Sequence, residues 1–249
     1  MLATIQYNSR KLQINLSQPL DISIPMRASK SNANAWYIEE PTIEAVKFED
    51  DVISVAEGAA VNFNTINFNP HAHGTHTECV GHITKEVHSV NQNLKQFFFL
   101  AEVVTVAPEE LDGDTVISKA QLQFALGNKK RDAIVIRTMP NTTDKLSRQY
   151  SNTNWTYLQE DAVAFLVKKG IKHLLIDLPS VDREEDGGEL KAHKVFWNFN
   201  GKLRKDATIT EFIYVPNNVD DGEYFLNLQI APFENDATPS KPILYKVLD

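Results

Sequence analysis

Two short apolar runs separated by a helical pattern constrain the fold more than any other feature of this chain. Residues 133–136 (Ala-Ile-Val-Ile) and 174–176 (Leu-Leu-Ile) have the length and apolar character of buried strands. Between them, four apolar side chains recur at the spacing of one helix face: Leu158, Ala162, Phe165 and Leu166. A strand, a helix and a second strand in this order form a βαβ unit, which favours parallel pairing. The sequence therefore predicts an α/β fold.

Capping residues indicate where two helices begin and end. Ser118 followed by Gln121 has the spacing of a capping box, in which the two side chains satisfy backbone N–H groups of the first turn. Thr156 followed by Gln159 has the same spacing and predicts the start of the second helix. Gly170 ends that helix, because glycine readily adopts the left-handed conformation common there.

Alternating and apolar segments predict the remaining strands. Residues 4–7 and 11–16 alternate in polarity and predict a β-hairpin, and residues 97–106 read as a buried strand. Further strands are expected at 210–215, 224–230 and 243–247. The chain has no internal repeat and no segment typical of an interdomain linker. We predict a single α/β domain over residues 1–249, with a mixed β-sheet and flanking helices.

Composition excludes several classes of partner. The chain has 25 Lys and Arg against 33 Asp and Glu, a net charge of -8, which disfavours binding to nucleic acid and to anionic membranes. The longest apolar stretch, residues 97–106, contains Glu102 and is about half the ~20 residues of a membrane span. The N-terminus lacks a signal peptide pattern. A single cysteine, Cys79, fits a reducing compartment, so we expect a cytoplasmic protein.

Residues that can bind metal concentrate in one segment. Four of the seven histidines lie close together, at His71, His73, His76 and His82. In an extended strand, His76 and Glu78 point to the same side, and His82 joins them if the strand continues. Imidazole nitrogen and carboxylate oxygen suit zinc, manganese or iron. The segment therefore predicts a metal site.

The pattern, and not any one histidine, carries this prediction. A lone histidine is usually a solvated or packed residue, whereas residues 69–82 combine four of them with a carboxylate and contain no Lys or Arg. The alternative is an incidental surface chelator. That alternative predicts no matching ligands elsewhere in the chain.

The segment at residues 73–82, His-Gly-Thr-His-x-Glu-x-x-Gly-His, resembles the signature of the cyclase family of metal-dependent hydrolases. This family includes bacterial-type kynurenine formamidase, and its usual signature is His-x-Gly-Thr-His-x-Asp-x-Pro-x-His. The likeness continues along most of the chain in the family's order: 20–23 (Leu-Asp-Ile-Ser) before Trp36, 136–138 (Ile-Arg-Thr), 176–182 (Ile-Asp-Leu-Pro-Ser-Val-Asp), His193 and Glu211. The resemblance implies a swivelling β/β/α-like fold.

Carried over by position, the resemblance implies a two-metal site. His76 matches a ligand of the first ion, and His193 matches a ligand of the second. Glu78 and Glu211 fall on the family's two bridging carboxylates. His82 matches the general acid/base.

Two departures from the signature bear on this site. The first histidine of the signature would fall on Ala72. His71 and His73 flank that position, and an irregular backbone beside Gly74 can bring either one in, with His71 slightly favoured. Glu78 is longer than aspartate by one carbon–carbon bond of about 1.5 Å, which can alter the metal–metal distance. The sequence leaves open whether one or two ions bind.

The function that the resemblance implies is metal-dependent hydrolysis of a small amide or formamide. Zinc is the expected cofactor, with manganese as an alternative. N-formyl-L-kynurenine, an intermediate in tryptophan catabolism to kynurenine, is the best-known family substrate (arylformamidase activity), and Trp36 is expected against the substrate. The chain contains no Gly-x-Ser-x-Gly elbow, which argues against a serine hydrolase.

Two alternatives remain at the level of sequence. One is a hydrolase of a cyclic amide such as an isatin-like ring. The other is a non-catalytic metal-binding or ligand-binding relic of the same fold. Because the family often forms oligomers, a homo-oligomer such as a dimer is expected, with a small molecule as the other partner.

Overall fold

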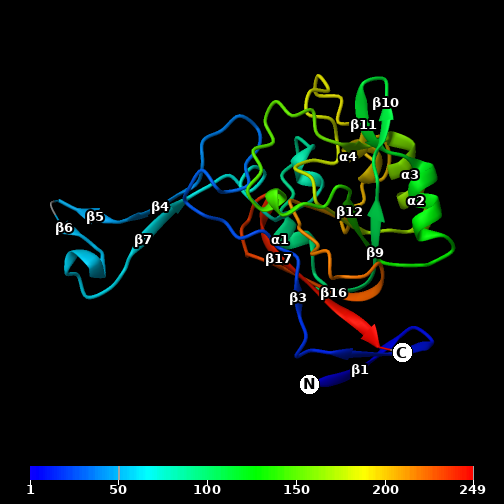
Figure 1. Ribbon diagram of the computed structural model, residues 1–249, viewed down its shortest axis with the longest axis horizontal. Coiled ribbons are helices and arrows are strands. Elements are labelled where there is room, and N and C mark those ends of the chain that lie inside the picture. The colour runs from blue at the N-terminus through cyan, green and yellow to red at the C-terminus, as the bar shows by residue number, and fades with distance from the viewer. Residues whose placement is uncertain (50, 249) are drawn as a thin grey trace.

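The computed structural model describes residues 1–49 and 51–248, and its central feature is a ten-stranded mixed sheet (Figure 1). The strands of this sheet are β1 (Leu2–Tyr7), β2 (Arg10–Asn15), β3 (Leu20–Asp21), β8 (His76–Glu78), β9 (Phe98–Val106), β12 (Ala133–Thr138), β14 (His173–Ile176), β15 (Thr208–Glu211), β16 (Gly222–Ile230) and β17 (Ala237–Leu248). The strands β9, β12, β14 and β15 are parallel to one another, and the other pairings are antiparallel.

The short strand β8 closes part of this sheet into a ring. It pairs with β15 along one edge and with the first residues of β17 along the other. The strands β17, β16, β9, β12, β14, β15 and β8 therefore follow one another around a closed barrel. Both edges of β8 are paired, so its side chains are held by neighbours from distant parts of the sequence.

Alternate residues of the central strands build two separate cores. Ile134 and Ile136 of β12 point to the helical side, where they pack with helix residues such as Leu166. Ala133 and Val135 point to the other side, into a second apolar cluster. The apolar run of residues 133–136 in β12 therefore follows from burial on both faces, which is typical of parallel strands.

The helices that cover the sheet are few and short. Their bounds are α1 (Val90–Asn93), α2 (Lys119–Leu126), α3 (Glu160–Lys169) and α4 (Lys191–Phe196), with 3₁₀ helices at η1 (Val55–Glu57), η2 (Val80–His82) and η3 (Thr143–Leu146). Helices α2, α3 and α4 gather on one side of the sheet (Figure 1). None of the helices in the described part of the chain combines the length and apolar character needed to cross a membrane.

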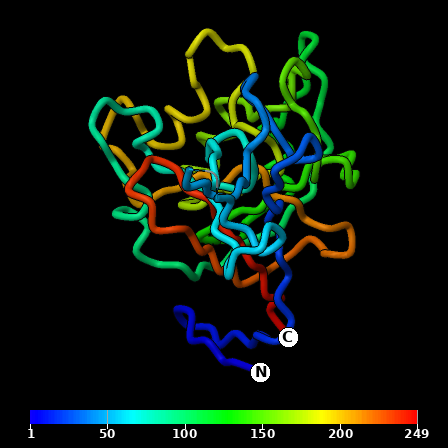
Figure 2. Tube along the Cα trace, turned by 90° about the vertical axis from the view of Figure 1, so that its left-hand side faces the viewer, coloured from blue at the N-terminus to red at the C-terminus, as the bar shows by residue number. Residues whose placement is uncertain are grey.

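Smaller sheets lie outside the barrel. One contains β10 (Glu109–Leu111), β11 (Asp114–Ile117) and β13 (Tyr157–Leu158); the others are the pairs β4 (Thr42–Ala45) with β7 (Asn64–Asn67) and β5 (Lys47–Phe48) with β6 (Asp51–Val52). The β4–β7 segment projects from the body as a long arm (Figure 1). The N-terminal hairpin lies at one end of the molecule, where β2 pairs with the last residues of β17 (Figure 2).

The fold class expected from sequence is confirmed: a single α/β domain with a mixed sheet and flanking helices. The N-terminal hairpin is formed by β1 and β2, and the βαβ unit is formed by β12, α3 and β14 with parallel pairing. Gly170 ends α3 in the left-handed conformation, with φ of 87°.

Two local predictions were wrong. Thr156 does not cap α3, because residues 157–158 form β13 and the Thr156 hydroxyl lies 2.8 Å from the hydroxyl of Thr115. The helix instead begins after Gln159, whose side chain makes no capping hydrogen bond. The strand expected at 210–215 ends at Glu211, because Phe212 adopts a left-handed conformation with φ of 54°.

The contrast between the true and the apparent capping box gives a stability prediction. Gln121→Ala removes a side chain that accepts from the N–H of Ser118 in the box of α2. It should lower the free energy of unfolding by about 1 kcal/mol. Gln159→Ala removes no capping bond and should change it by less than about 0.5 kcal/mol. Denaturant unfolding measures both variants, and equal losses would contradict the assignment.

Candidate metal centre

Cross-strand pairing of β8 and β15 places the first pair of site residues together. His76 lies opposite Glu211 in the register, and its Nε2 is 3.4 Å from Glu211 Oε2. Thr77 points to the other face, where its hydroxyl lies 2.8 Å from that of Thr210. His76 and Glu78 therefore share one side of the strand, as the alternation predicted, and both are fully buried.

A turn before β8 brings in His71. The side-chain oxygen of Asn69 accepts from the His71 N–H at 2.9 Å, and the Asn69 carbonyl accepts from the N–H of Ala72 at 3.2 Å. This turn directs the His71 ring inward, where Nδ1 lies 3.2 Å from Glu78 Oε2. An irregular backbone thus brings His71, and not a residue at position 72, to Glu78.

His73 does not join this cluster, contrary to its inclusion among the expected ligands. Its Nδ1 accepts from the N–H of Asn69 at 2.8 Å, and its Nε2 lies 2.8 Å from the carbonyl oxygen of Glu39. Both ring nitrogens are therefore engaged with the backbone. Neither nitrogen is therefore directed at the cluster.

His82 reaches the cluster by a different route from the one expected. The strand ends at Glu78, and residues 80–82 form the 3₁₀ helix η2. The His82 ring then lies beside that of His71, with centroids 4.3 Å apart, and its Nδ1 is 3.8 Å from Glu78 Oε2. Gly81 permits this turn, since a Cβ there would lie 2.1 Å from the carbonyl oxygen of His88.

His193 is held from behind by Asp182. The Asp182 carboxylate accepts from the N–H of Ala192 at 2.7 Å and from that of His193 at 3.1 Å, at the start of α4. It also lies 2.6 Å from His193 Nδ1. The opposite nitrogen, Nε2, is 3.2 Å from Glu78 Oε1 and 3.9 Å from Glu211 Oε1. Asp182 therefore supports the His193 ring from the side away from Glu78.

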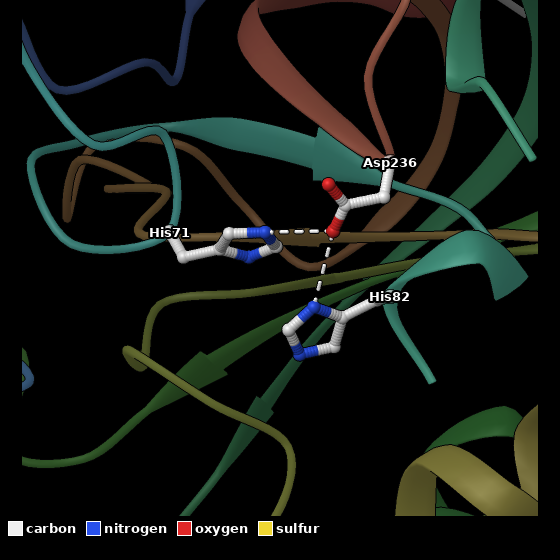
Figure 3. A group of neighbouring side chains, drawn as sticks. All are labelled: His71, His82 and Asp236. Carbon is white, nitrogen blue, oxygen red and sulfur yellow. Dashed lines mark hydrogen bonds and ion pairs between the residues drawn. The ribbon is translucent and has the colours of Figure 1, made fainter. Parts of the chain in front are cut away.

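Asp236 is a member of the cluster that sequence reasoning missed. Its Oδ2 lies 2.9 Å from His71 Nε2 and 3.2 Å from His82 Nδ1 (Figure 3). The residue belongs to the loop between β16 and β17, in a polar stretch without a recognisable motif. No local signal predicts its place, because only the pairing of β17 with β8 brings it here.

Buried charges in the cluster compensate one another when no cation is bound. Burial alone would lower the pKa of His71, but the nearby carboxylates of Asp236 and Glu78 outweigh it and raise this pKa to about 10. Burial opposes a charged His193 as well, yet Asp182 and Glu78 raise its pKa well above the ordinary value. Burial favours protonated Glu78, but the nearby imidazoles hold the pKa of its carboxyl well below the usual range.

Two buried atoms at the centre of the cluster lack hydrogen-bond partners. Among the described residues, His76 Nε2 and Glu78 Oε2 are buried without one. Such atoms are rare in native proteins and call for a physical explanation. Ligand atoms of His71, His76 and Glu78 lie within 4.8 Å of one another, as do those of Glu78, His82 and His193. The residues present therefore fit one or two divalent cations.

A cavity of about 310 Å³ opens onto these ligands. Its walls include Trp36, Ile38 and Leu190 beside His71, His82, His193 and Glu211. Trp36 packs edge-on against Trp155, with ring centroids 4.9 Å apart and planes at 85°. The predicted substrate-facing Trp36 is therefore placed on the cavity wall.

The neighbouring histidines provide a matched pair of variants. His71→Ala removes an inward-facing donor and should weaken binding of Zn²⁺ or Mn²⁺ by on the order of 100-fold or more. His73→Ala removes a ring bound to the backbone and should leave the affinity within a few-fold of the wild type. Competition with a coloured chelator measures both, and a larger loss for His73→Ala would contradict the placement of the two rings.

Cation binding should release protons at neutral pH. The raised pKa of His71 means that the metal-free folded protein holds a proton that the unfolded chain loses near pH 6.5. Protonation of His71 thereby stabilises the metal-free folded state. The stabilisation is complete below about pH 6.5 and is lost as pH rises through about 10. Because a ligand must be neutral, Zn²⁺ binding at pH 7 should expel that proton. Calorimetry in buffers of different ionisation enthalpy measures the release, and the share from His71 should halve near pH 10 and vanish above it. Zero release at pH 7 would contradict the charge assignment.

Comparison with solved structures gives the same fold at low sequence identity. A "potential metal-dependent hydrolase with cyclase activity" is 17% identical, with a TM-score of 0.66 over 92% of this chain and 97% of its own. A "predicted metal-dependent hydrolase" from Bacillus stearothermophilus is 17% identical, with a TM-score of 0.65 over 92% and 98%. Isatin hydrolase A from Labrenzia aggregata is 12% identical, with a TM-score of 0.68 over 93% and 94%.

Among curated protein sequences, none matches the chain significantly. The family model named Cyclase, described as "Putative cyclase", matches residues 14–183, which is more than half of the chain. The matched range contains the segment from His71 to His82 and ends before His193, Glu211 and Asp236. The likeness inferred from the histidine motif is thus confirmed independently, and this chain belongs to the Cyclase family.

Proposed function

We propose that this protein is a metal-dependent amidohydrolase of small aromatic amides. The observation that carries the proposal is the pair of unpartnered buried atoms, His76 Nε2 and Glu78 Oε2, in a cluster whose other histidines line an apolar cavity. Membership of the Cyclase family and the likeness in fold to metal-dependent hydrolases support it.

The residues that would hold a divalent cation are those whose ring nitrogens and carboxylate oxygens converge inside the barrel: His71, His76, Glu78, His193 and Glu211. Zinc and manganese both suit this donor set. A bound cation of this kind supplies Lewis acidity, which activates water towards a carbonyl carbon. Imidazole nitrogens of His71 and His193 lie 3.2 Å from the two oxygens of Glu78, so the donor atoms already converge without a cation.

We assign proton transfer to His82. It lines the cavity, and its Nδ1 is engaged by Asp236 at 3.2 Å, so Nε2 is the atom free to exchange a proton with a bound molecule. Cleavage of an amide C–N bond needs a proton on the departing nitrogen, since an amide anion leaves poorly. The imidazole of His82 supplies that proton as general acid.

The cavity wall favours a neutral aromatic ring. Trp36, Ile38, Ala72 and Leu190 provide an apolar wall that excludes water, and no Lys or Arg is among the described residues that line the cavity. The zwitterionic amino-acid group of N-formyl-L-kynurenine would find no cation for its carboxylate there. An isatin-like cyclic amide needs none, and isatin hydrolase A is among the proteins of similar fold. We therefore favour this class over the formamide.

Hydrolysis of isatin and of N-formyl-L-kynurenine by the zinc-loaded and manganese-loaded protein tests the proposal. Turnover should be lost on chelation and return with added cation. His82→Ala should lower kcat by roughly 10²–10⁴-fold. His88→Ala, in a neighbouring histidine outside the cavity wall, should leave kcat unchanged.

The outcomes separate the competing functions. Faster hydrolysis of isatin than of the formamide supports the neutral-ring proposal, and the reverse order restores arylformamidase activity as the better candidate. A protein that binds cations but hydrolyses no amide or lactone would be a non-catalytic relic, which contradicts the proposal.

A further inference from the structure

A carboxylate outside the family signature links two histidines of the site. Figure 3 shows a single oxygen of Asp236, Oδ2, facing both His71 Nε2 at 2.9 Å and His82 Nδ1 at 3.2 Å. The other ring nitrogen of His71, Nδ1, faces inward to Glu78 at 3.2 Å. Asp236 therefore lies behind His71 as seen from the centre of the cluster.

The backbone around Asp236 is fixed by the barrel. Ala237 lies opposite Glu78 in the pairing of β17 with β8, and the Cys79 N–H donates to the Asp236 carbonyl at 3.0 Å. The Val90 N–H donates to the preceding carbonyl, that of residue 235, at 2.9 Å. The segment also packs tightly against Gly81, where an added Cβ would lie 3.2 Å from Asp236 Cβ. The carboxylate is thus held beside His71 by several independent contacts.

The hydrogen bond to Asp236 determines which nitrogen of His71 carries the proton. An ionised carboxylate only accepts hydrogen bonds, so His71 Nε2 must be the N–H. In the neutral ring the lone pair then lies on Nδ1, which is the nitrogen directed at Glu78. A neutral His71 is thereby oriented as a ligand.

The same arrangement occurs at the other two buried ligands of the cluster. His193 has Nδ1 at 2.6 Å from Asp182 and directs Nε2 at Glu78. His76 has Nδ1 at 3.0 Å from the Gly74 carbonyl and leaves Nε2 buried without a partner. Three histidines therefore each have an oxygen on the outer nitrogen and direct the inner nitrogen towards the centre of the cluster. Metal-bound histidines are commonly supported in this way.

We propose that Asp236 is a positioning residue for His71. By accepting a hydrogen bond from His71 Nε2–H, it leaves His71 Nδ1 as the atom that binds the cation. His71 then supplies the ligand that the family signature has at position 72, where this chain has alanine. The inference rests on the metal centre of the proposed function. A different arrangement, in which Asp236, His71 Nε2 and His82 Nδ1 ligate a further ion of their own, would need His71 Nε2 without its proton.

Cation binding by two variants tests the proposal without relying on turnover. Asp236→Ala should weaken Zn²⁺ binding by about 10–100-fold in chelator competition while the number of ions per chain stays unchanged. Asp236→Asn retains an oxygen that can accept from Nε2–H, so it should recover most of the affinity. In the Co²⁺-loaded protein, the visible spectrum of Asp236→Asn should match the wild type, and that of Asp236→Ala should shift. The isosteric Asn variant keeps the test available if Asp236→Ala does not fold.

Glu234→Ala is the matched control in the same loop. Its carboxylate accepts from the side chains of Asn91 and Gln92 at the surface, so its loss should leave cation affinity unchanged. Loss of one whole ion in Asp236→Ala would make Asp236 a ligand and overturn the positioning role. Unchanged affinity would overturn it too, while leaving the metal centre and the proposed hydrolysis intact. A wild-type protein that binds no divalent cation would contradict the proposed function itself.

Discussion

The burial of the Glu78 carboxylate is the constraint on which the rest of the site depends. A charge removed from water is costly unless opposite charge and hydrogen bonds surround it. Imidazoles of His71, His82 and His193 lie within 4 Å of its two oxygens. Even so, Oε2 has no hydrogen-bond partner, and the neighbouring His76 Nε2 has none either. A divalent cation would satisfy both atoms, which favours a metal centre over a structural ion-pair network as the explanation of the cluster.

Closure of the barrel through β8 assembles this environment from distant parts of the chain. Pairing with β15 brings Glu211 to His76 on one edge, and pairing with β17 brings the Asp236 loop to the other. The carboxyl end of the parallel strand β14 leads to Asp182, which orients His193 at the start of α4. The fold of the sheet thus brings three carboxylates from distant parts of the sequence, those of Asp182, Glu211 and Asp236, into contact with histidines of the site.

Local sequence patterns predicted the features of the fold that depend on backbone geometry within one short segment. The alternation around β8 placed His76 and Glu78 on one side, and the apolar runs of the βαβ unit predicted the parallel strands. Choosing His71 over His73 depends on a turn at Asn69, and finding Asp236 depends on the register of β17 against β8. Neither is encoded by spacing within a motif, since each follows from pairing across long stretches of chain. The false capping box at Thr156 has a similar cause, because pairing of β13 with β11 overrides a local helix signal.

The proposed metal centre requires a cation between Glu78 and the inner nitrogens of His71, His76 and His193. Anomalous diffraction from crystals soaked in Zn²⁺ or Mn²⁺ tests this directly. We expect a peak about 2.0–2.3 Å from His76 Nε2 and from a Glu78 oxygen, with Asp236 bonded to His71 on the far side. A peak ligated only by Asp236, His71 Nε2 and His82, or no peak at all with His76 Nε2 still unpartnered, would contradict it.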